Sequence, residues 1–236
     1  MKFTGERAIV SQMSVVIEKE HLDRYYYLKE YVNGKRVLDV ACGSGYGSEI
    51  IANYGCSLYL GIDVSEEAIK YARKHYKRDN VNFICENGID LRSVGDNEFD
   101  VVVSYETIEH IKRYDLFLKE LKRVTKPNGT IIISTPNKKY SSPNKIQPIN
   151  KYHVIEFYFN DFYSLLGKYF SNIILKGQDF QSKPKFLKGL IIRLFPKKIR
   201  QSLIPKKIRS AYNLNQVSYI NDRPENSKYL IAICKR

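Results

Sequence analysis

Three residues in one short stretch carry groups suited to acid–base or metal chemistry. Glu106, Glu109 and His110 are three and four positions apart, and side chains at that spacing share one face of a helix. A second element, residues 152–157, contains His153 and is expected to close over the same place. Carboxylates and imidazoles bind divalent ions, and either can act as a general base. The pattern predicts a metal site or a catalytic base, with His110 and His153 as the catalytic candidates.

A glycine-rich loop is a second chemical signal. Gly43, Gly45 and Gly47 lie in this loop, and glycines let the backbone approach a ligand closely. Asp63 follows at a distance of about 20 residues, where an acid can accept hydrogen bonds from ribose hydroxyls. The loop lacks both the GxGxxG spacing of dinucleotide folds and the Lys-Ser or Lys-Thr pair of a P-loop. These features predict a ligand that contains a nucleoside.

Strands and helices alternate around these residues. Strands are predicted at residues 36–40, 58–62, 81–85, 99–104 and 130–134, and helices at 18–31, 48–54, from 65 onward, and in a segment that ends at 124. After a long loop, a helix is predicted at 160–169 and strands at 173–175 and 229–233. Such alternation is typical of βαβ units and a mainly parallel α/β sheet. Ligands bind such sheets at the carboxyl ends of the strands, where the candidate residues lie.

The motifs resemble those of the class I S-adenosylmethionine-dependent methyltransferases. The matching segments lie at residues 37–45, 61–63, 99–104 and 127–132, in the family's order. The resemblance implies a Rossmann-like, seven-stranded, mainly parallel sheet whose last strand, at residues 229–233, is antiparallel. We expect an N-terminal helical cap at residues 1–34 and a methyltransferase domain at residues 35–236. A basic helical insertion is expected at residues 181–225, before the last strand.

The resemblance also implies a set of residues that bind the cofactor. Asp39 and the loop backbone would hold the methionine part, and Asp63 the ribose hydroxyls. Val64 would lie against adenine. Asn87 stands where the family usually has an acid, but its carbonyl can still accept from the adenine amino group. The full implied set is Asp39, Ala41, Gly43, Ser44, Gly45, Asp63, Val64, Asn87, Gly88 and Tyr105.

On the acceptor side, the Glu-x-x-Glu-His pattern looks like that of two methyltransferase groups. These are the ubiquinone-type catechol O-methyltransferases and the enzymes that methylate the 2′-hydroxyl at the 3′ end of small RNAs. In the RNA group a later histidine completes a metal site, and His153 is the matching residue. The implied ligands of Mg²⁺ or another divalent metal are Glu106, Glu109, His110 and His153. The same pattern also occurs in related enzymes without a metal, where it orders the start of a helix.

The N-terminal segment points to a different acceptor. Residues 3–7 and 20–25, together with residues 134–138, His153 and Glu156, resemble small methyltransferases found with bacterial surface-polysaccharide synthesis. In that reading His21, Arg24 and Tyr25 cap the pocket, and the reaction is O-methylation of a sugar or glycan hydroxyl. The alternatives are a metal-dependent methyltransferase for the RNA 3′ end, a methyltransferase for a catechol-like molecule or an amino sugar, and a non-catalytic scaffold. Nucleic acid is the less favoured partner.

The positive charge is concentrated in one segment. The chain of 236 residues has a formal net charge of +14, and residues 183–209 hold ten Lys or Arg and no Asp or Glu. Without them 29 basic and 25 acidic residues remain. Apolar residues interleave with these cations, which predicts contact with an anionic membrane surface, although RNA phosphates or a solvated lobe would also fit. The four cysteines have no CxxC spacing, and no signal peptide is apparent, so we expect a cytoplasmic protein, peripheral at the inner face of the membrane.

Overall fold

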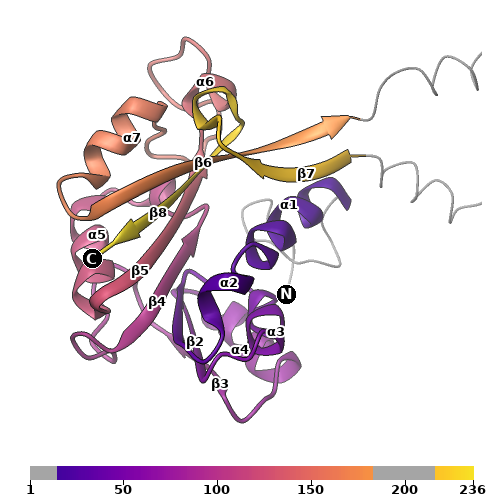
Figure 1. The fold of residues 1–236 in the computed structure, drawn as a ribbon, viewed down its shortest axis with the longest axis vertical. Helices are drawn as coiled ribbons and strands as arrows, with labels where there is room; N and C mark the ends of the chain where they lie inside the picture. The colour runs from indigo at the N-terminus through magenta and orange to yellow at the C-terminus, as the bar shows by residue number, and fades with distance from the viewer. Residues whose placement is uncertain (1–14, 183–215) are drawn as a thin grey trace, which may run out of the picture.

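The computed structural model describes residues 15–182 and 216–236. Its centre is one eight-stranded sheet with the order β3-β2-β1-β4-β5-β8-β6-β7. The strands are β1 (Arg36–Val40), β2 (Leu58–Asp63), β3 (Val81–Cys85), β4 (Phe99–Tyr105), β5 (Thr125–Pro136), β6 (Ser171–Ser182), β7 (Gln216–Asn221) and β8 (Tyr229–Lys235). The first five run parallel, and β8 is antiparallel to β5 (Figure 1). The predicted α/β class and the antiparallel last strand are confirmed, but the sheet has one strand more than the expected seven.

Helices cover both faces of the sheet (Figure 1). They are α1 (Val15–Tyr26), α2 (Lys29–Val32), α3 (Gly47–Asn53), α4 (Glu66–His75), α5 (Tyr114–Val124), α6 (Lys138–Ser141) and α7 (Phe159–Leu166). One core includes Phe117 of α5 and Phe162 of α7, and the other includes Tyr25 of α1 and Ile69 of α4. Successive residues of β4 alternate between these two cores, as expected when both faces of a strand are buried. The predicted helix at 18–31 is divided into α1 and α2.

The additional strand lies at one edge of the sheet. The short strand predicted at 173–175 is the centre of the longer β6, which pairs on one side with β8 and on the other with β7. Ser182 at the end of β6 pairs with Gln216 at the start of β7, so the two strands lie side by side at this point (Figure 1). The described end of the predicted helical insertion is therefore a strand followed by the 3₁₀ turn η2 (Pro224–Asn226).

Two sequence features fall outside the described residues. They are the basic segment 183–209 and the N-terminal motif at residues 3–7. In the part that is described, α1 shares a core with α3 and the sheet, so the predicted N-terminal cap packs directly on the predicted methyltransferase domain. Among residues 15–182 and 216–236, no helix has the length and apolar composition needed to cross a bilayer.

Candidate active site

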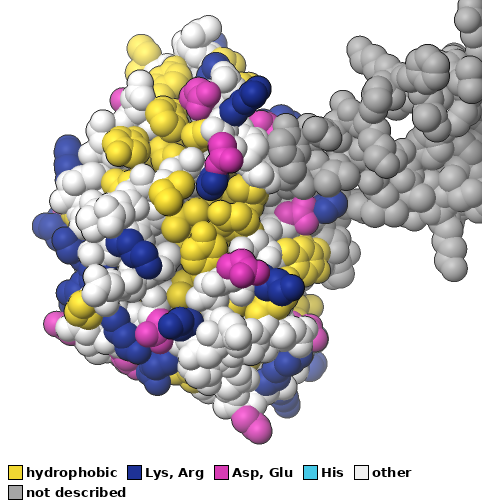
Figure 2. Space-filling view, viewed as in Figure 1, with side chains coloured by type: hydrophobic (Ala, Val, Ile, Leu, Met, Phe, Trp, Pro, Cys, Tyr) yellow, Lys and Arg dark blue, Asp and Glu magenta, His cyan; other side chains and the backbone are white. Residues whose placement is uncertain are grey.

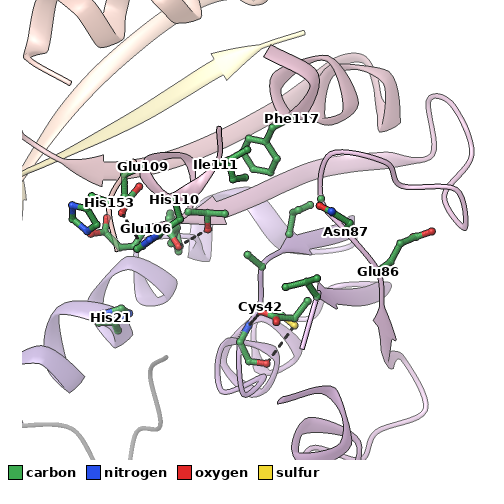
Figure 3. A pocket seen from close by; sticks show the side chains of 18 of the residues that line it. His21, Cys42, Glu86, Asn87, Glu106, Glu109, His110, Ile111, Phe117 and His153 are labelled. Atoms are coloured by element: carbon green, nitrogen blue, oxygen red, sulfur yellow. Dashed lines mark hydrogen bonds and ion pairs between the residues drawn. The ribbon is translucent and has the colours of Figure 1, made fainter. Parts of the chain in front are cut away.

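A cavity of about 430 Å³ opens at the carboxyl ends of the parallel strands. It is bordered by the segments that follow β1, β2, β3 and β4, by α1 and by the loop that precedes α7. Figure 3 shows its two ends, with Cys42, Glu86 and Asn87 at one and the group of acids and histidines at the other. The strand polarity therefore gathers the candidate residues into one site, as expected for an open α/β sheet.

The three loop glycines have different structural roles. Gly43 adopts a left-handed backbone conformation with φ of +56°, and a Cβ placed there would meet no atom within 4 Å. Gly45 also has a positive φ, and a Cβ there would lie 2.7 Å from the Ala72 side chain and 2.8 Å from that of Phe83. A Cβ at Gly47 would overlap the ring of Tyr25. Of the three, Gly43 alone lines the cavity, whereas the other two allow close packing beneath it.

Asp63 links the end of β2 to the glycine loop. Its Oδ2 accepts a hydrogen bond from the Gly43 amide at 2.9 Å, and its Oδ1 accepts one from the Ser65 amide at 2.9 Å. An ionised carboxylate has about four acceptor positions, so two remain for hydroxyl groups of a ligand. Asp63 and the exposed Val64 both line the cavity. Asp63 can therefore fix the loop and hold a vicinal diol at the same time.

Asp39 is buried beneath the cavity rather than in its wall. Its Oδ2 accepts hydrogen bonds from the hydroxyls of Tyr25 and Tyr59, both at 2.8 Å. Its Oδ1 has no hydrogen-bond partner in the described part of the chain. Burial raises the pKa of this carboxyl to about 6. Its contact with the cavity runs through Tyr25, which does line it.

The carboxylate–histidine stretch lies in a loop and a 3₁₀ turn. β4 ends at Tyr105, Glu106 has a left-handed φ of 51°, η1 covers Ile108–His110, and α5 begins only at Tyr114. The prediction of one helix with Glu106, Glu109 and His110 on a shared face is therefore wrong. The reason is tertiary, because the Glu106 amide is held by the carbonyl of Ser134 at 3.2 Å and by its hydroxyl at 3.1 Å.

Glu106 points towards Arg24 and β5. Its Oε1 accepts from the Ser134 hydroxyl at 2.6 Å and lies 3.6 Å from a terminal nitrogen of Arg24. Arg24 is almost fully buried and does not line the cavity, although Glu106 does. Glu106 thus lines the cavity but is not a member of the cluster of Glu109, His110 and His153.

Glu109, His110 and His153 each offer one ligand atom, and these atoms lie within 4.8 Å of one another. Glu109 is buried, and its Oε2 accepts from the Thr135 hydroxyl at 3.1 Å. Burial and then the nearby Glu106 raise the pKa of Glu109. His110 Nδ1 lies 3.0 Å from the carbonyl oxygen of Tyr152, and a carbonyl can only accept, so this nitrogen carries the proton. Nε2 is then the basic nitrogen of His110.

His153 is hydrogen-bonded at both ring nitrogens. Nδ1 donates to Glu156 Oε1 at 2.6 Å, and Nε2 lies 2.9 Å from the side-chain amide nitrogen of Asn150. The rings of His110 and His153 meet edge to face with centroids 4.9 Å apart. The loop that carries His153 is joined to the Glu109 carbonyl by the amides of Val154 and Ile155. These contacts hold the second histidine rigidly against the first.

The wall formed by α1 is aromatic and uncharged. His21 Nδ1 and the Tyr46 hydroxyl are 3.0 Å apart, and the ring of Tyr25 packs edge to face against Tyr46 and Tyr105. Burial, followed by the charge of Arg24, lowers the pKa of His21 to about 3. His21 is therefore neutral at physiological pH, and it closes the cavity by its shape rather than by its charge.

Comparison with known proteins agrees with this geometry. The family model for a methyltransferase domain matches residues 38–133, which include the glycine loop, Asp63 and the carboxylate–histidine stretch. Residues 38–133 of the chain thus match a methyltransferase domain. The motifs predicted S-adenosylmethionine as the cofactor, and the names of the relatives agree with that prediction.

Relatives are similar to this domain in sequence, and a solved structure is similar to it in fold. The chain is 30% identical over 161 residues to a probable S-adenosylmethionine-dependent methyltransferase of Mycolicibacterium smegmatis, in a match that covers 66% of the chain and 60% of that protein. It is 31% identical over 123 residues to a ubiquinone biosynthesis O-methyltransferase of Coxiella burnetii, covering 50% of the chain and 52% of the relative. The match therefore spans less than two thirds of either relative's length. An S-adenosylmethionine-dependent methyltransferase from Mesorhizobium loti has the same fold, with a TM-score of 0.61, 15% identity and coverage of 97% and 100%.

The residues of this methyltransferase domain fit the cofactor. Gly43 leaves the space above the loop open, and Asp63 has acceptor positions left for the ribose hydroxyls. A Cβ at Gly88 would lie 2.9 Å from the Val40 side chain, so a glycine fits closely at the position where the resemblance implies adenine. Asn87 Oδ1 accepts from the Ile89 amide at 3.2 Å and keeps a second acceptor position. The unpaired Oδ1 of Asp39 lies beneath the loop, where the resemblance implies the methionine part of the cofactor.

Most predicted residues of the methyltransferase site line its cavity. They are Ala41, Gly43, Asp63, Val64, Asn87, Gly88, Tyr105, Glu106, Glu109, His110 and His153. Asp39, Ser44 and Gly45 do not line it, and they support the loop from below. Several lining residues were not predicted from the sequence: Val40, Cys42, Tyr46, Glu86, Thr107, Ile111, Phe117 and Asn150. Most of them adjoin a predicted residue in the chain, but no sequence signal marks Asn150.

Proposed function

We propose that this methyltransferase transfers a methyl group from S-adenosylmethionine to a hydroxyl of a sugar or glycan. The observation that carries the proposal is the pairing of His110. Its Nδ1 is fixed by the Tyr152 carbonyl, and its Nε2 lies 4.0 Å from Glu109 Oε1 at the acceptor end of the cavity. Of the two histidines at the acceptor end of the cavity, His110 has the more exposed side chain, 28% against 9% for His153. We therefore assign His110 as the base, and His153, which is bound to Glu156 and Asn150, as the residue that positions the acceptor side.

The reaction needs one proton transfer. When bound, S-adenosylmethionine supplies an electrophilic methyl group on its sulfonium. His110 Nε2 accepts the acceptor hydroxyl proton while the oxygen bonds to the methyl carbon, and the broken carbon–sulfur bond leaves its electron pair on sulfur. The products are the methyl ether and S-adenosylhomocysteine. The His110 side chain is 28% exposed, so its proton can return to solvent.

The polar character of the acceptor end supports a polyhydroxylated substrate. Glu106, Glu109, Asn150 and His153 lie around His110 and line the same cavity. A sugar brings several neighbouring hydroxyls, each of which needs a hydrogen-bond partner when it leaves water. The name of the Coxiella relative supports O-methylation and keeps a catechol-like acceptor as the alternative.

The test is an acceptor screen with two variants. Wild-type protein is incubated with labelled S-adenosylmethionine and nucleotide sugars, lipid-linked glycans, amino sugars, catechols or short RNA. We expect label on a sugar hydroxyl, and the H110Q variant should lower kcat by about 10²-fold with unchanged affinity for S-adenosylhomocysteine. H153A should also lower turnover and spare cofactor binding. Labelling of catechol or RNA alone would contradict the proposed acceptor, and full activity of H110Q would contradict the proposed base.

A metal-assisted reaction is the second candidate, because Glu109, His110 and His153 are close enough to share an ion. Such an ion would hold a vicinal diol, as at the 3′ end of RNA, and lower the pKa of the attacking hydroxyl. Glu106 lies outside this cluster, and the Asn150 amide would have to leave His153 Nε2. A chelator followed by graded Mg²⁺ separates the two routes. Activity that is lost and then restored supports the metal, and unchanged activity supports His110 acting alone.

A further inference from the structure

The segment between β5 and α7 presents apolar side chains to solvent. Ile146 is 90% exposed and Ile149 is 63% exposed. Tyr140, Tyr152 and Tyr158 on the same segment are also exposed. We call residues 137–158 the apolar rim. In Figure 2 hydrophobic side chains reach the top of the molecule, where α6 lies in Figure 1. Exposed apolar side chains that gather in one patch can mark an interaction site.

The apolar rim is held in place by its own hydrogen bonds. Lys138 Nζ donates to the Ile146 carbonyl at 3.2 Å, and the Ile149 amide donates to the Ser142 hydroxyl at 2.8 Å. Farther along, the Tyr152 amide donates to Asn150 Oδ1 at 3.1 Å. The backbone is therefore fixed on both sides of the two isoleucines, so their exposed position follows from the fold of the apolar rim.

The exposed charged side chains of the apolar rim are all cationic. Residues 137–155 include Lys138, Lys139, Lys145 and Lys151 and contain no Asp or Glu. Three of these ammonium groups lie over tyrosine rings, at 5.6 Å for Lys138 and Tyr158, 5.7 Å for Lys139 and Tyr140, and 4.9 Å for Lys151 and Tyr152. The nearest acid in sequence, Glu156, is buried against His153. The surface is thus a cationic, aromatic border around two aliphatic side chains.

The apolar rim also borders the active site. Asn150 and His153 belong to this segment and line the cavity, and Figure 3 shows His153 beside His110 and Glu109. The amides of Val154 and Ile155 bond to the Glu109 carbonyl, so the rim and the acceptor end form one continuous structure. A partner that contacts the rim therefore meets the acceptor side of the cavity.

We propose that the apolar rim docks on an anionic phospholipid bilayer. Aliphatic tips insert among acyl chains, tyrosines prefer the interface, and lysines pair with anionic headgroups. RNA would satisfy the lysines but would leave Ile146 and Ile149 in water. The inference concerns residues distinct from the basic segment 183–209, and it does not depend on the identity of the acceptor.

Vesicle flotation tests the docking surface with the full chain. Wild-type protein should float with vesicles of phosphatidylcholine and phosphatidylglycerol, and much less with phosphatidylcholine alone. Replacing both isoleucines, I146D with I149D, should lower the partition coefficient roughly tenfold or more, because two apolar side chains leave the interface. The matched control is I174D, since Ile174 is 54% exposed on β6. Absence of wild-type flotation, or equal flotation of the double variant, would overturn the proposal.

Two further measurements locate the contact. Replacing Lys145 and Lys151 by Gln should weaken binding to the anionic vesicles roughly fivefold per lysine at low salt, whereas K74Q with K77Q should not. A polarity-sensitive dye is then attached at I146C in a C85S background, because Cys85 is the exposed native thiol in the described residues. Its emission should shift to the blue on binding. Lipid docking by the apolar rim would be refuted if the dye emission did not shift although the protein floated. It would also be refuted if the lysine replacements weakened binding to RNA and left binding to vesicles unchanged.

Discussion

Arg24 on α1 donates its Nε hydrogen to Gln178 Oε1 on β6 at 2.7 Å, across 154 positions of the chain. Both side chains are fully buried, and Gln178 Nε2 donates in turn to the Glu20 carbonyl at 3.0 Å. The guanidinium also lies 4.5 Å above the ring of Tyr229 on β8. The aromatic wall of the active site is thereby anchored to the C-terminal strands, although the two are far apart in sequence.

The first prediction concerns this anchor. R24M should lower the free energy of unfolding by about 3–5 kcal/mol, because it leaves Gln178 and the nearby carboxylates of Glu20 and Glu106 without their cation. Urea denaturation followed by circular dichroism measures the change. R113M is the control, since Arg113 is 61% exposed and pairs with the surface residue Asp115. That variant should stay within about 0.5 kcal/mol of wild type, and equal losses in both would contradict a structural role for Arg24.

The second prediction concerns the glycine loop. G47A places a methyl group in the ring of Tyr25, so the ring must leave its hydrogen bond with Asp39. We expect a loss of about 1–3 kcal/mol in unfolding free energy from overpacking, together with weaker cofactor binding. G43A meets no atom and should cost only the strain of a left-handed backbone, about 1–2 kcal/mol. Denaturation of both variants, with and without S-adenosylhomocysteine, measures the loss of unfolding free energy and the stabilisation by the ligand. Cofactor binding by G47A that matches wild type would show that Tyr25 is not needed.

The third prediction concerns Asp63. D63A removes the carboxylate that would hold the ribose hydroxyls and also frees the Gly43 amide. Since a hydrogen bond to a charged group contributes about 1.5–3 kcal/mol, affinity for S-adenosylhomocysteine should fall by about 10²-fold or more. Isothermal titration calorimetry measures it. D161A, an exposed acid on α7, should bind as wild type does. An affinity of D63A close to that of wild type would exclude the proposed cofactor contact.

The fourth prediction concerns pH. Burial raises the pKa of Asp39 from 3.8 to about 6, so the folded state binds this proton more tightly than the unfolded state. Between these values the folded state holds more protons, and stability falls as pH rises. D39N keeps an acceptor for Tyr25 and Tyr59 but cannot ionise. Its unfolding free energy relative to wild type should therefore rise from pH 4 to pH 6 by up to about 3 kcal/mol. A constant difference across this range would mean that Asp39 titrates normally.

The sequence predicts those strands whose bounds depend only on residues close together in the chain. β1 and β3 have the predicted bounds, because short β-branched runs between turn residues are read from neighbouring positions. The position of Asp63 at the end of β2 is predicted for the same reason. The cofactor end of the site follows from these strands, because their polarity alone brings the loop, Asp63 and Asn87 to one edge.

Other features depend on contacts that the sequence does not display. The backbone of Glu106 is held by Ser134 on a neighbouring strand, and the sequence does not display this contact. The spacing of the acids and the histidine therefore predicted a helix where the chain forms a loop. The mixed composition of β7 does not predict a strand, and β7 forms by antiparallel pairing with β6. Asn150 reaches His153 through the fold of the apolar rim, in which nothing marks it as a site residue.

The pairing of Ser182 with Gln216 has a practical consequence for the basic segment between them. Because Ser182 and Gln216, which flank residues 183–215, face each other in an antiparallel pair, a two-residue Asn-Gly turn can replace the whole stretch. Such an excision shortens one connection and leaves every described strand with its neighbours. The role of this segment at the membrane can therefore be measured by comparing the membrane binding of the full chain with that of the shortened chain. It can also be measured by inserting the segment into a hairpin of another protein.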